Sequence, residues 1–130
     1  MESLGSKPVI LIIESDQRLC EALKAELEGE AIPVCFSSVS EVKQSLKQGK
    51  LSPEFNAAIV QMIDNTKDEL SNLTEIFAEI DDIPVFLTLS YDGNFQLEQS
   101  YIRSWTDHIY FRPFEVDKLI GALRAEISKQ

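Results

Sequence analysis

Short apolar runs recur along the chain and alternate with longer stretches that carry apolar residues at helical spacing. The runs lie at Val9–Ile13, Ile32–Phe36, Ala57–Val60, Pro84–Leu89 and Ile109–Phe111. Each run is continuous rather than alternating with polar residues, which is typical of strands that are covered on both faces. The pattern therefore predicts five buried strands.

The stretches between and after these runs predict five helices. The first begins after Asp16, a good N-cap residue, and ends near Gly29. The second begins with a capping box at Ser38 and ends at Gly49. The others are expected after Thr66, after Asn94, and over an apolar stripe of Val116, Leu119, Ile120, Leu123 and Ile127. Strict alternation of strand and helix implies an α/β fold, a doubly wound parallel sheet with helices on both faces.

The length and charge of the chain narrow its class and its partners. Its 130 residues fit one domain, 1–130, with a core over about 8–128. The formal net charge of −10 would repel phosphate backbones and anionic lipids, so we expect neither nucleic acid nor a membrane as a partner. No apolar run is long enough for a membrane span and no secretory signal is visible, which favours a cytoplasmic location. In that reducing compartment, Cys20 and Cys35 are expected to be free buried thiols.

Several kinds of catalytic or cofactor site are excluded by the sequence. The glycines lie at least 20 residues apart, which excludes G-x-G-x-x-G, a P-loop and a G-x-S-x-G elbow. Glu14 and Asp16 would repel a flavin phosphate after the first strand. His108 is the only histidine, so no histidine-based metal cluster exists, and we interpret it as a solvated loop residue. We therefore predict no enzyme activity, no cofactor and no metal.

A binding site in an open parallel sheet lies beyond the carboxyl ends of the strands, where the strand order reverses. The predicted strands end in a small set of residues with polar or charged side chains and one leucine: Glu14, Ser15, Asp16, Gln61, Leu89 and Arg112.

Three segments of the chain resemble response-regulator receiver domains of the chemotaxis type. Ile10–Asp16 (ILIIESD) is similar to their first strand and acidic cluster, and Ile83–Val85 (IPV) to the start of their fourth strand. Arg112–Phe114 (RPF) resembles their Lys-Pro-Phe sequence. The spacing agrees over about residues 8–128. The resemblance implies a flavodoxin-like sheet with strand order 2-1-3-4-5.

The resemblance also assigns positions in the phosphorylation site of that family. There, an acidic pair helps to bind Mg²⁺, an aspartate accepts a phosphoryl group from a histidine kinase, and a hydroxyl and a lysine stabilise that group. In this chain, Glu14 and Ser15 fall on the acidic pair, Gln61 on the phosphoacceptor, Leu89 on the hydroxyl and Arg112 on the lysine.

These departures remove the chemistry of the site. The carboxamide of Gln61 has no anionic oxygen to attack phosphorus. Ser15 is a poor ligand for Mg²⁺, and Leu89 cannot donate a hydrogen bond. Glu14 and Arg112 remain, and we predict that they form an ion pair with Gln61 as a hydrogen-bonding neighbour.

Three further residues near this site have alternative interpretations. Asp64 is the nearest alternative phosphoacceptor, in the loop after the third strand. Asp16 could be a remaining metal ligand, but an N-cap is favoured. Ile109 stands where the family has its aromatic switch residue, and we expect it to pack permanently against Leu89 opposite it.

The sequence thus predicts an atypical receiver, or pseudo-receiver, that acts in two-component signal transduction by protein–protein interaction and without phosphorylation. The face formed by the fourth helix, fifth strand and fifth helix is the expected docking surface, with Phe95, Tyr101, Trp105 and Tyr110 as aromatic anchors. Two alternatives remain open at this point. One is a conventional phosphorelay receiver with an unconventional phosphoacceptor, and the other is a small-molecule-binding domain that uses the vacated pocket.

Overall fold

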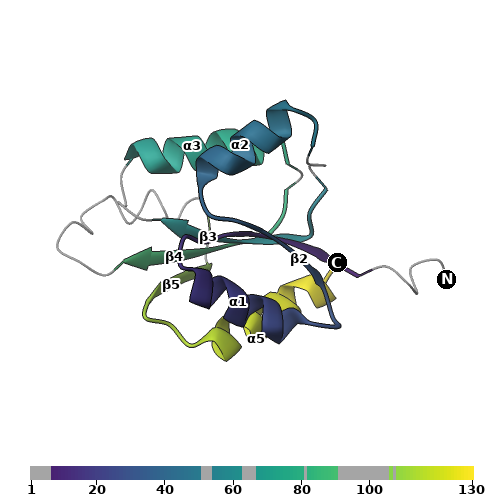
Figure 1. Ribbon diagram of the computed structural model, residues 1–130. Helices are drawn as coiled ribbons and strands as arrows, with labels where there is room; N and C mark the ends of the chain where they lie inside the picture. Colours follow the sequence, from purple (N-terminus) through teal and green to yellow (C-terminus); the bar gives the residue numbers. More distant parts are fainter. Residues whose placement is uncertain (1–6, 51–53, 63–66, 81, 91–105, 107) are drawn as a thin grey trace.

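A computed structural model of the protein describes residues 7–50, 54–62, 67–80, 82–90, 106 and 108–130 (Figure 1). Within these residues, five strands form one parallel sheet in the order β2-β1-β3-β4-β5, which confirms the predicted order. The strands are β1 (Val9–Ile13), β2 (Ile32–Phe36), β3 (Ala57–Met62), β4 (Val85–Ser90) and β5 (His108–Arg112).

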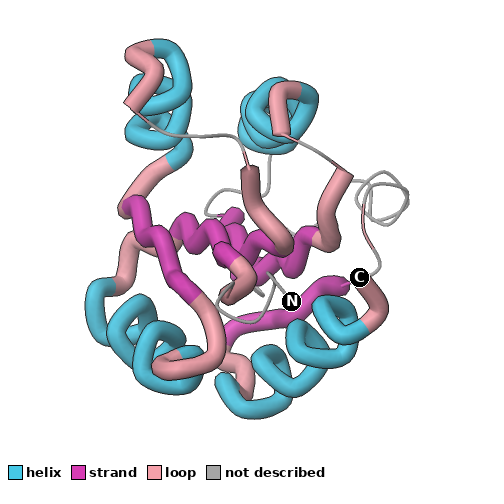
Figure 2. Tube along the Cα trace, turned by 90° about the vertical axis from the view of Figure 1, so that its right-hand side faces the viewer, coloured by secondary structure: helices cyan, strands magenta, loops and turns pink. Residues whose placement is uncertain are grey.

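The described helices cover the two faces of this sheet. They are α1 (Gln17–Leu27), α2 (Val39–Lys47), α3 (Lys67–Ala78) and α5 (Val116–Ser128). Helices α2 and α3 lie on one face and α1 and α5 on the other (Figure 1), so that the strands are enclosed between two helical layers (Figure 2). The helix predicted after Asn94 lies outside the described residues. None of the helices in the described ranges is long and apolar enough to cross a membrane.

Helix α2 shows how the local sequence sets the ends of an element. At its start, the hydroxyl of Ser38 accepts a hydrogen bond from Glu41 N (3.3 Å), and Glu41 Oε1 accepts one from Ser37 N (2.9 Å). This is close to the predicted capping box. Gly49 lies just past its end with φ +70°, and Gly29 past α1 with φ +83°, a conformation that glycine adopts without steric cost.

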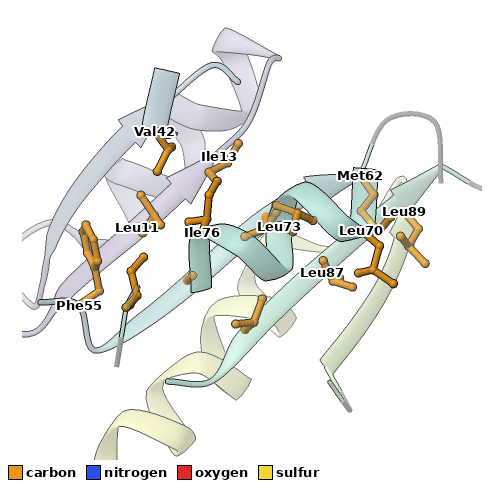
Figure 3. Packing of buried hydrophobic residues seen from close by; sticks show 14 residues of the cluster. Leu11, Ile13, Val42, Phe55, Met62, Leu70, Leu73, Ile76, Leu87 and Leu89 are labelled. Carbon is orange, nitrogen blue, oxygen red and sulfur yellow. The ribbon is translucent and has the colours of Figure 1, made fainter. Parts of the chain in front are cut away.

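The sheet separates two hydrophobic cores, because successive residues of a strand point to opposite faces. Leu11 and Ile13 of β1 belong to the core under α2 and α3, whereas Ile10 and Ile12 belong to the core over α1 and α5. Side chains of α3 pack onto β3 and β4 in the first core (Figure 3). The second core is closed by the predicted stripe of α5, in which Leu119, Ile120 and Leu123 are buried. Burial on both faces is the physical reason why the strands are continuous apolar runs.

The two cysteines belong to the second core and are free thiols, as predicted. Cys20 is buried, whereas Cys35 is only half-buried, which departs from the expectation that both would be inside. The pKa of the Cys35 thiol is raised to about 12. The largest cause is desolvation by burial, and a hydrogen bond with Cys20 adds to it.

Candidate functional site

The carboxyl ends of β1 and β5 bring Glu14 and Arg112 together. Arg112 Nη1 donates to Glu14 Oε1 (2.9 Å) and Nη2 donates to Oε2 (3.1 Å), so the guanidinium holds both carboxylate oxygens. The side chain of Glu14 is 1% exposed and that of Arg112 is 20% exposed. The predicted ion pair is therefore confirmed, and it lies largely beneath the surface.

Thr88, which the sequence analysis did not single out, completes this cluster. Its side chain is fully buried in β4, and its hydroxyl accepts a second hydrogen bond from Arg112 Nη1 (3.2 Å). Thr88 lies two residues after Phe86 in β4, and Phe86 belongs to the core of the α1 and α5 face. The alternation of side chains along a strand is the signal that places the hydroxyl of Thr88 on the same face as Arg112.

Leu89, the predicted counterpart of the family's hydroxyl residue, points away from this cluster. It is fully buried in the core under α2 and α3. Ile109 packs against the same core, but the predicted register was wrong. Leu89 lies beside Phe111, and Ile109 lies beside Leu87, because the β4–β5 register is offset by two residues from the expected one.

Ser15 and Gln61 bond to each other rather than to the ion pair. Gln61 Oε1 accepts hydrogen bonds from the backbone N and the hydroxyl of Ser15, both at 2.8 Å. The prediction that Gln61 neighbours the Glu14–Arg112 pair through a hydrogen bond is therefore wrong. The physical reason is that the two donors of Ser15, in the loop after β1, already occupy the side-chain oxygen of Gln61. The two neutral replacements thus tie the loop after β1 to β3.

Asp16 is the N-cap of α1, as the sequence favoured. Its Oδ1 accepts from Arg18 N (3.0 Å), and its own backbone N donates to Glu14 Oε2 (3.0 Å). Its carboxylate serves the helix end, which is the positive end of the helix dipole. Asp64, the alternative phosphoacceptor, lies outside the described residues.

This set of side chains does not fit Mg²⁺, the ion that the resemblance to receiver domains implies. Mg²⁺ requires hard oxygen ligands that offset its dehydration. Among the described residues, Glu14 is the one carboxylate at the centre of the cluster, and both of its oxygens already face a guanidinium. Ser15 and Gln61 offer only neutral oxygens, which are committed to one another. In the described part of the chain, His, Cys, Asp and Glu side chains form no group of three that could hold a metal ion.

An open groove of about 390 Å³ runs beside the ion pair, between the start of α1 and the turn that leads into α5. Leu19, Pro113 and Phe114 form its apolar part, and Asp16 and Arg112 its polar part. The Cζ atom of Arg112 lies 6.0 Å from the centre of the Phe114 ring, within reach of a cation–π interaction. The polar side chains that line the groove are already engaged, Arg112 with Glu14 and Asp16 with the start of α1.

The residues predicted to anchor a partner are described only in part. Tyr110, in β5, packs against the core of the α1 and α5 face, with its ring centre 6.4 Å from those of Phe86 and Phe114. Partial burial raises the pKa of the Tyr110 phenol. Phe95, Tyr101 and Trp105 lie outside the described residues.

Comparison with solved structures places this fold among receiver domains. The receiver domain of the Francisella response regulator 1452 matches with a TM-score of 0.71 and 15% identity, over 95% of this chain and 98% of that chain. A response regulator receiver protein from Burkholderia phymatum matches with a TM-score of 0.70 and 14% identity, over 94% and 96%. A protein described as an adenylate cyclase from Rhodopirellula baltica matches with a TM-score of 0.74 and 15% identity, over 95% and 89%.

Sequence comparison adds nothing to this likeness. No family model matches the chain, and no curated protein matches it. The chain therefore has the fold of response-regulator receiver domains, with 14–15% sequence identity to the two receiver proteins named above.

Proposed function

We propose that this chain is a receiver-like signalling module that acts by binding a protein partner and is not controlled by phosphorylation. The observation that carries the proposal is the two-pronged Glu14–Arg112 ion pair. The guanidinium of Arg112 occupies both oxygens of Glu14, the one acidic residue left at the positions where the resemblance implies a Mg²⁺ site. The module would then keep one conformation whatever the state of a kinase.

The residue at the phosphoacceptor position supports the same conclusion. Gln61 carries an amide in place of a carboxylate, so it has no nucleophilic oxygen for phosphoryl transfer. Its oxygen also accepts two hydrogen bonds from Ser15, which hold it against the loop. The side chain thus serves as a structural tie between β1 and β3.

The proposal extends to location and activity. A two-component signalling role belongs in the cytoplasm, and the chain would be a single domain without enzyme activity. The Rhodopirellula neighbour described as an adenylate cyclase shares only 15% identity, so that activity does not transfer with the fold.

Acetyl phosphate tests the loss of phosphorylation. Intact-mass spectrometry of the protein with acetyl phosphate and Mg²⁺ should show no phosphoryl adduct, while a conventional receiver treated in parallel gains one. An adduct that disappears in Asp64→Asn would contradict the proposal and identify Asp64 as the acceptor.

Substitutions on the helices test the partner face. We infer that the partner docks on the side of the molecule formed by β5 and α5, and that Tyr101 and Trp105 contribute to binding. Asp117→Arg, on the exposed side of α5, should weaken partner binding by about tenfold, because reversing a charge at an interface opposes complementarity. Glu79→Arg, exposed just past the end of α3, is the matched control and should leave binding unchanged. Equal effects of both substitutions would place the partner elsewhere.

A further inference from the structure

A second cavity lies at the end of the sheet opposite to the Glu14–Arg112 pair. The arrows of β3 and β4 point toward the left in Figure 1, and the cavity lies where β4 and β5 begin. Its volume is about 590 Å³, larger than the groove of about 390 Å³ beside the ion pair. A cavity of this size is within the range that holds small ligands, which is about 300–1,000 Å³.

One wall of this cavity is apolar. Phe77 comes from α3, Val85 is the first residue of β4, and Pro84 directly precedes it. Two backbone groups at this wall already have hydrogen-bond partners. Thr106 Oγ1 donates to Val85 O (2.6 Å) and accepts from His108 N (3.1 Å). The wall therefore offers an apolar surface for the body of a ligand.

The polar side of the cavity is acidic. Asp82 is exposed at its edge, and the structure gives its carboxylate no ion-pair or hydrogen-bond partner among the described residues. Glu126 lines the cavity from α5, with its side chain 25% exposed. In the ranges that the structure describes, its lysine partner is Lys129, whose Nζ lies 3.1 Å from Glu126 Oε2 and whose side chain is 70% exposed and does not line the cavity. With the net charge of −10 over the whole chain, the local field favours a cation.

His108 also lines the cavity, and it is not the solvated loop residue that we expected. It is the first residue of β5, its side chain is 28% exposed, and its ring stacks on Phe86 with centres 4.2 Å apart. Its Nε2 lies 3.7 Å from Glu126 Oε2, which holds that carboxylate at the cavity. Stacking on Phe86 fixes the position of the His108 ring, so its Nε2 is held in place beside the Glu126 carboxylate.

We propose that this cavity is a binding site for a small organic cation, an amine attached to an apolar or aromatic body. The body would pack against Phe77 and Pro84, and the ammonium would lie between Asp82 and Glu126. This inference is independent of the proposed loss of phosphorylation, since it involves the opposite end of the sheet and no residue of the phosphorylation-site positions.

Phenethylamine is a suitable probe, with phenethyl alcohol as its neutral analogue and phenylacetate as its anionic one. Amide shifts of ¹⁵N-labelled full-length protein should respond saturably at Val85 and His108, with a dissociation constant of about 1 mM for so small a ligand. Phenethyl alcohol should bind about tenfold more weakly, and phenylacetate should not bind. Equal binding of the alcohol and the amine, preference for phenylacetate, or no saturable shift with phenethylamine would each overturn the proposal.

Two variants separate the site from general attraction by an acidic protein. Asp82→Asn should weaken phenethylamine binding by about fivefold, while Glu79→Gln, which removes the same charge outside the cavity, should leave it unchanged. Equal losses in both variants would show a nonspecific effect and contradict the site.

A capped lysine residue distinguishes the source of the cation. Tighter binding of capped lysine than of phenethylamine would overturn the small-molecule assignment and point to a lysine side chain of another protein.

Discussion

The Glu14 carboxylate is removed from solvent and yet fully satisfied. Its side chain is 1% exposed, and its oxygens accept from two guanidinium nitrogens of Arg112 and from the backbone N of Asp16. An isolated carboxylate at this depth would be costly, so the three donors offset the cost of burying it. A substitution of either Glu14 or Arg112 should therefore destabilise the site at the carboxyl ends of β1 and β5.

Removing Arg112 tests this dependence. Arg112→Ala leaves Glu14 buried without its cation and should lower the free energy of unfolding by roughly 3 kcal/mol. Arg112→Lys keeps the charge but loses the planar fork, so it should cost only about 1 kcal/mol. Urea denaturation measures both. Glu14→Ala/Arg112→Ala should be less destabilised than the sum of the single losses, and strictly additive losses would contradict a coupled pair.

Restoring carboxylates tests whether Arg112 itself excludes Mg²⁺. Ser15→Asp/Gln61→Asp should still bind Mg²⁺ poorly, because the guanidinium repels the ion from Glu14. Adding Arg112→Ala to that pair should allow binding, and a dissociation constant near 1 mM would stabilise the variant by about 1.4 kcal/mol at about 10 mM Mg²⁺. The melting temperature with Mg²⁺ and with a matched ionic strength of NaCl reports the difference. A Mg²⁺ response of the double variant as large as that of the triple one would show that the neutral residues alone emptied the site.

Cys35 gives the stability of the protein a dependence on alkaline pH. Its pKa is raised from 9.0 to about 12 in the folded state, first by desolvation. The stabilisation linked to the protonated thiol is therefore complete below about pH 9 and is lost as the pH rises from about 9 toward 12. Between those values, the free energy of unfolding should fall more steeply for the natural protein than for Cys35→Ala, with Cys20→Ala as a check on the neighbouring thiol. Parallel curves for the natural protein and Cys35→Ala would show that this group does not contribute.

At the residue scale, the sequence predicts the charged pair but not its surroundings. Glu14 and Arg112 stand at strand ends with opposite charge, and that is sufficient to pair them. Thr88 and the Ser15–Gln61 bond depend on which face of the sheet each side chain occupies. Aligning the chain with the motifs of receiver domains points to Leu89 instead of the adjacent Thr88. Such an alignment does not consider the face of the strand on which each side chain lies.

At the scale of elements, local signals account for most of the fold. The predicted ends of α2 at Ser38 and Gly49 are confirmed, since caps act within a few residues of the chain. Strand β3 is longer than predicted and continues from Val60 to Met62. The polar side chain of Gln61 suggested an end, but its backbone remains in the ladder, paired with Thr88. Such pairing depends on a distant strand and is not visible in the local pattern.

The cap of α2 provides a test at this scale. Ser38→Ala removes the acceptor for Glu41 N and should lower the free energy of unfolding by about 1 kcal/mol. Ser40→Ala, within the first turn of the same helix, is the matched control and should change it by less than about 0.5 kcal/mol. Urea denaturation of the two variants compares them directly. Equal stability of both would mean that the Ser38 hydroxyl does not cap the helix in solution.

At the scale of the whole molecule, the sheet keeps two polar regions apart. The Glu14–Arg112 cluster lies at the carboxyl ends of the strands, and the acidic cavity lies where β4 and β5 begin. The two hydrophobic cores fill the space between these ends on either face. A substitution in one polar region should therefore leave the other intact, which allows each to be tested in the folded protein.

The balance of charge over the molecule gives the last prediction. The chain carries 22 acidic and 12 basic residues, so its charges repel one another on average. Its exposed ion pairs, such as Lys43–Glu75, oppose this repulsion, but pairs of this kind contribute little. Raising NaCl from about 20 to about 300 mM shortens the screening length from about 20 to about 6 Å and weakens both effects.

Because the repulsion is spread over many charges, its relief should dominate, and added salt should raise the melting temperature by about 4 °C, equivalent to about 1 kcal/mol. The variant Glu28→Lys/Glu54→Lys/Glu79→Lys changes the net charge from −10 by three reversals of two units each, to −4, at exposed positions. Its melting temperature should respond to salt much less than that of the natural protein. A fall of the melting temperature with salt in the natural protein would instead mean that its ion pairs outweigh the repulsion, since screening removes whichever interaction is larger.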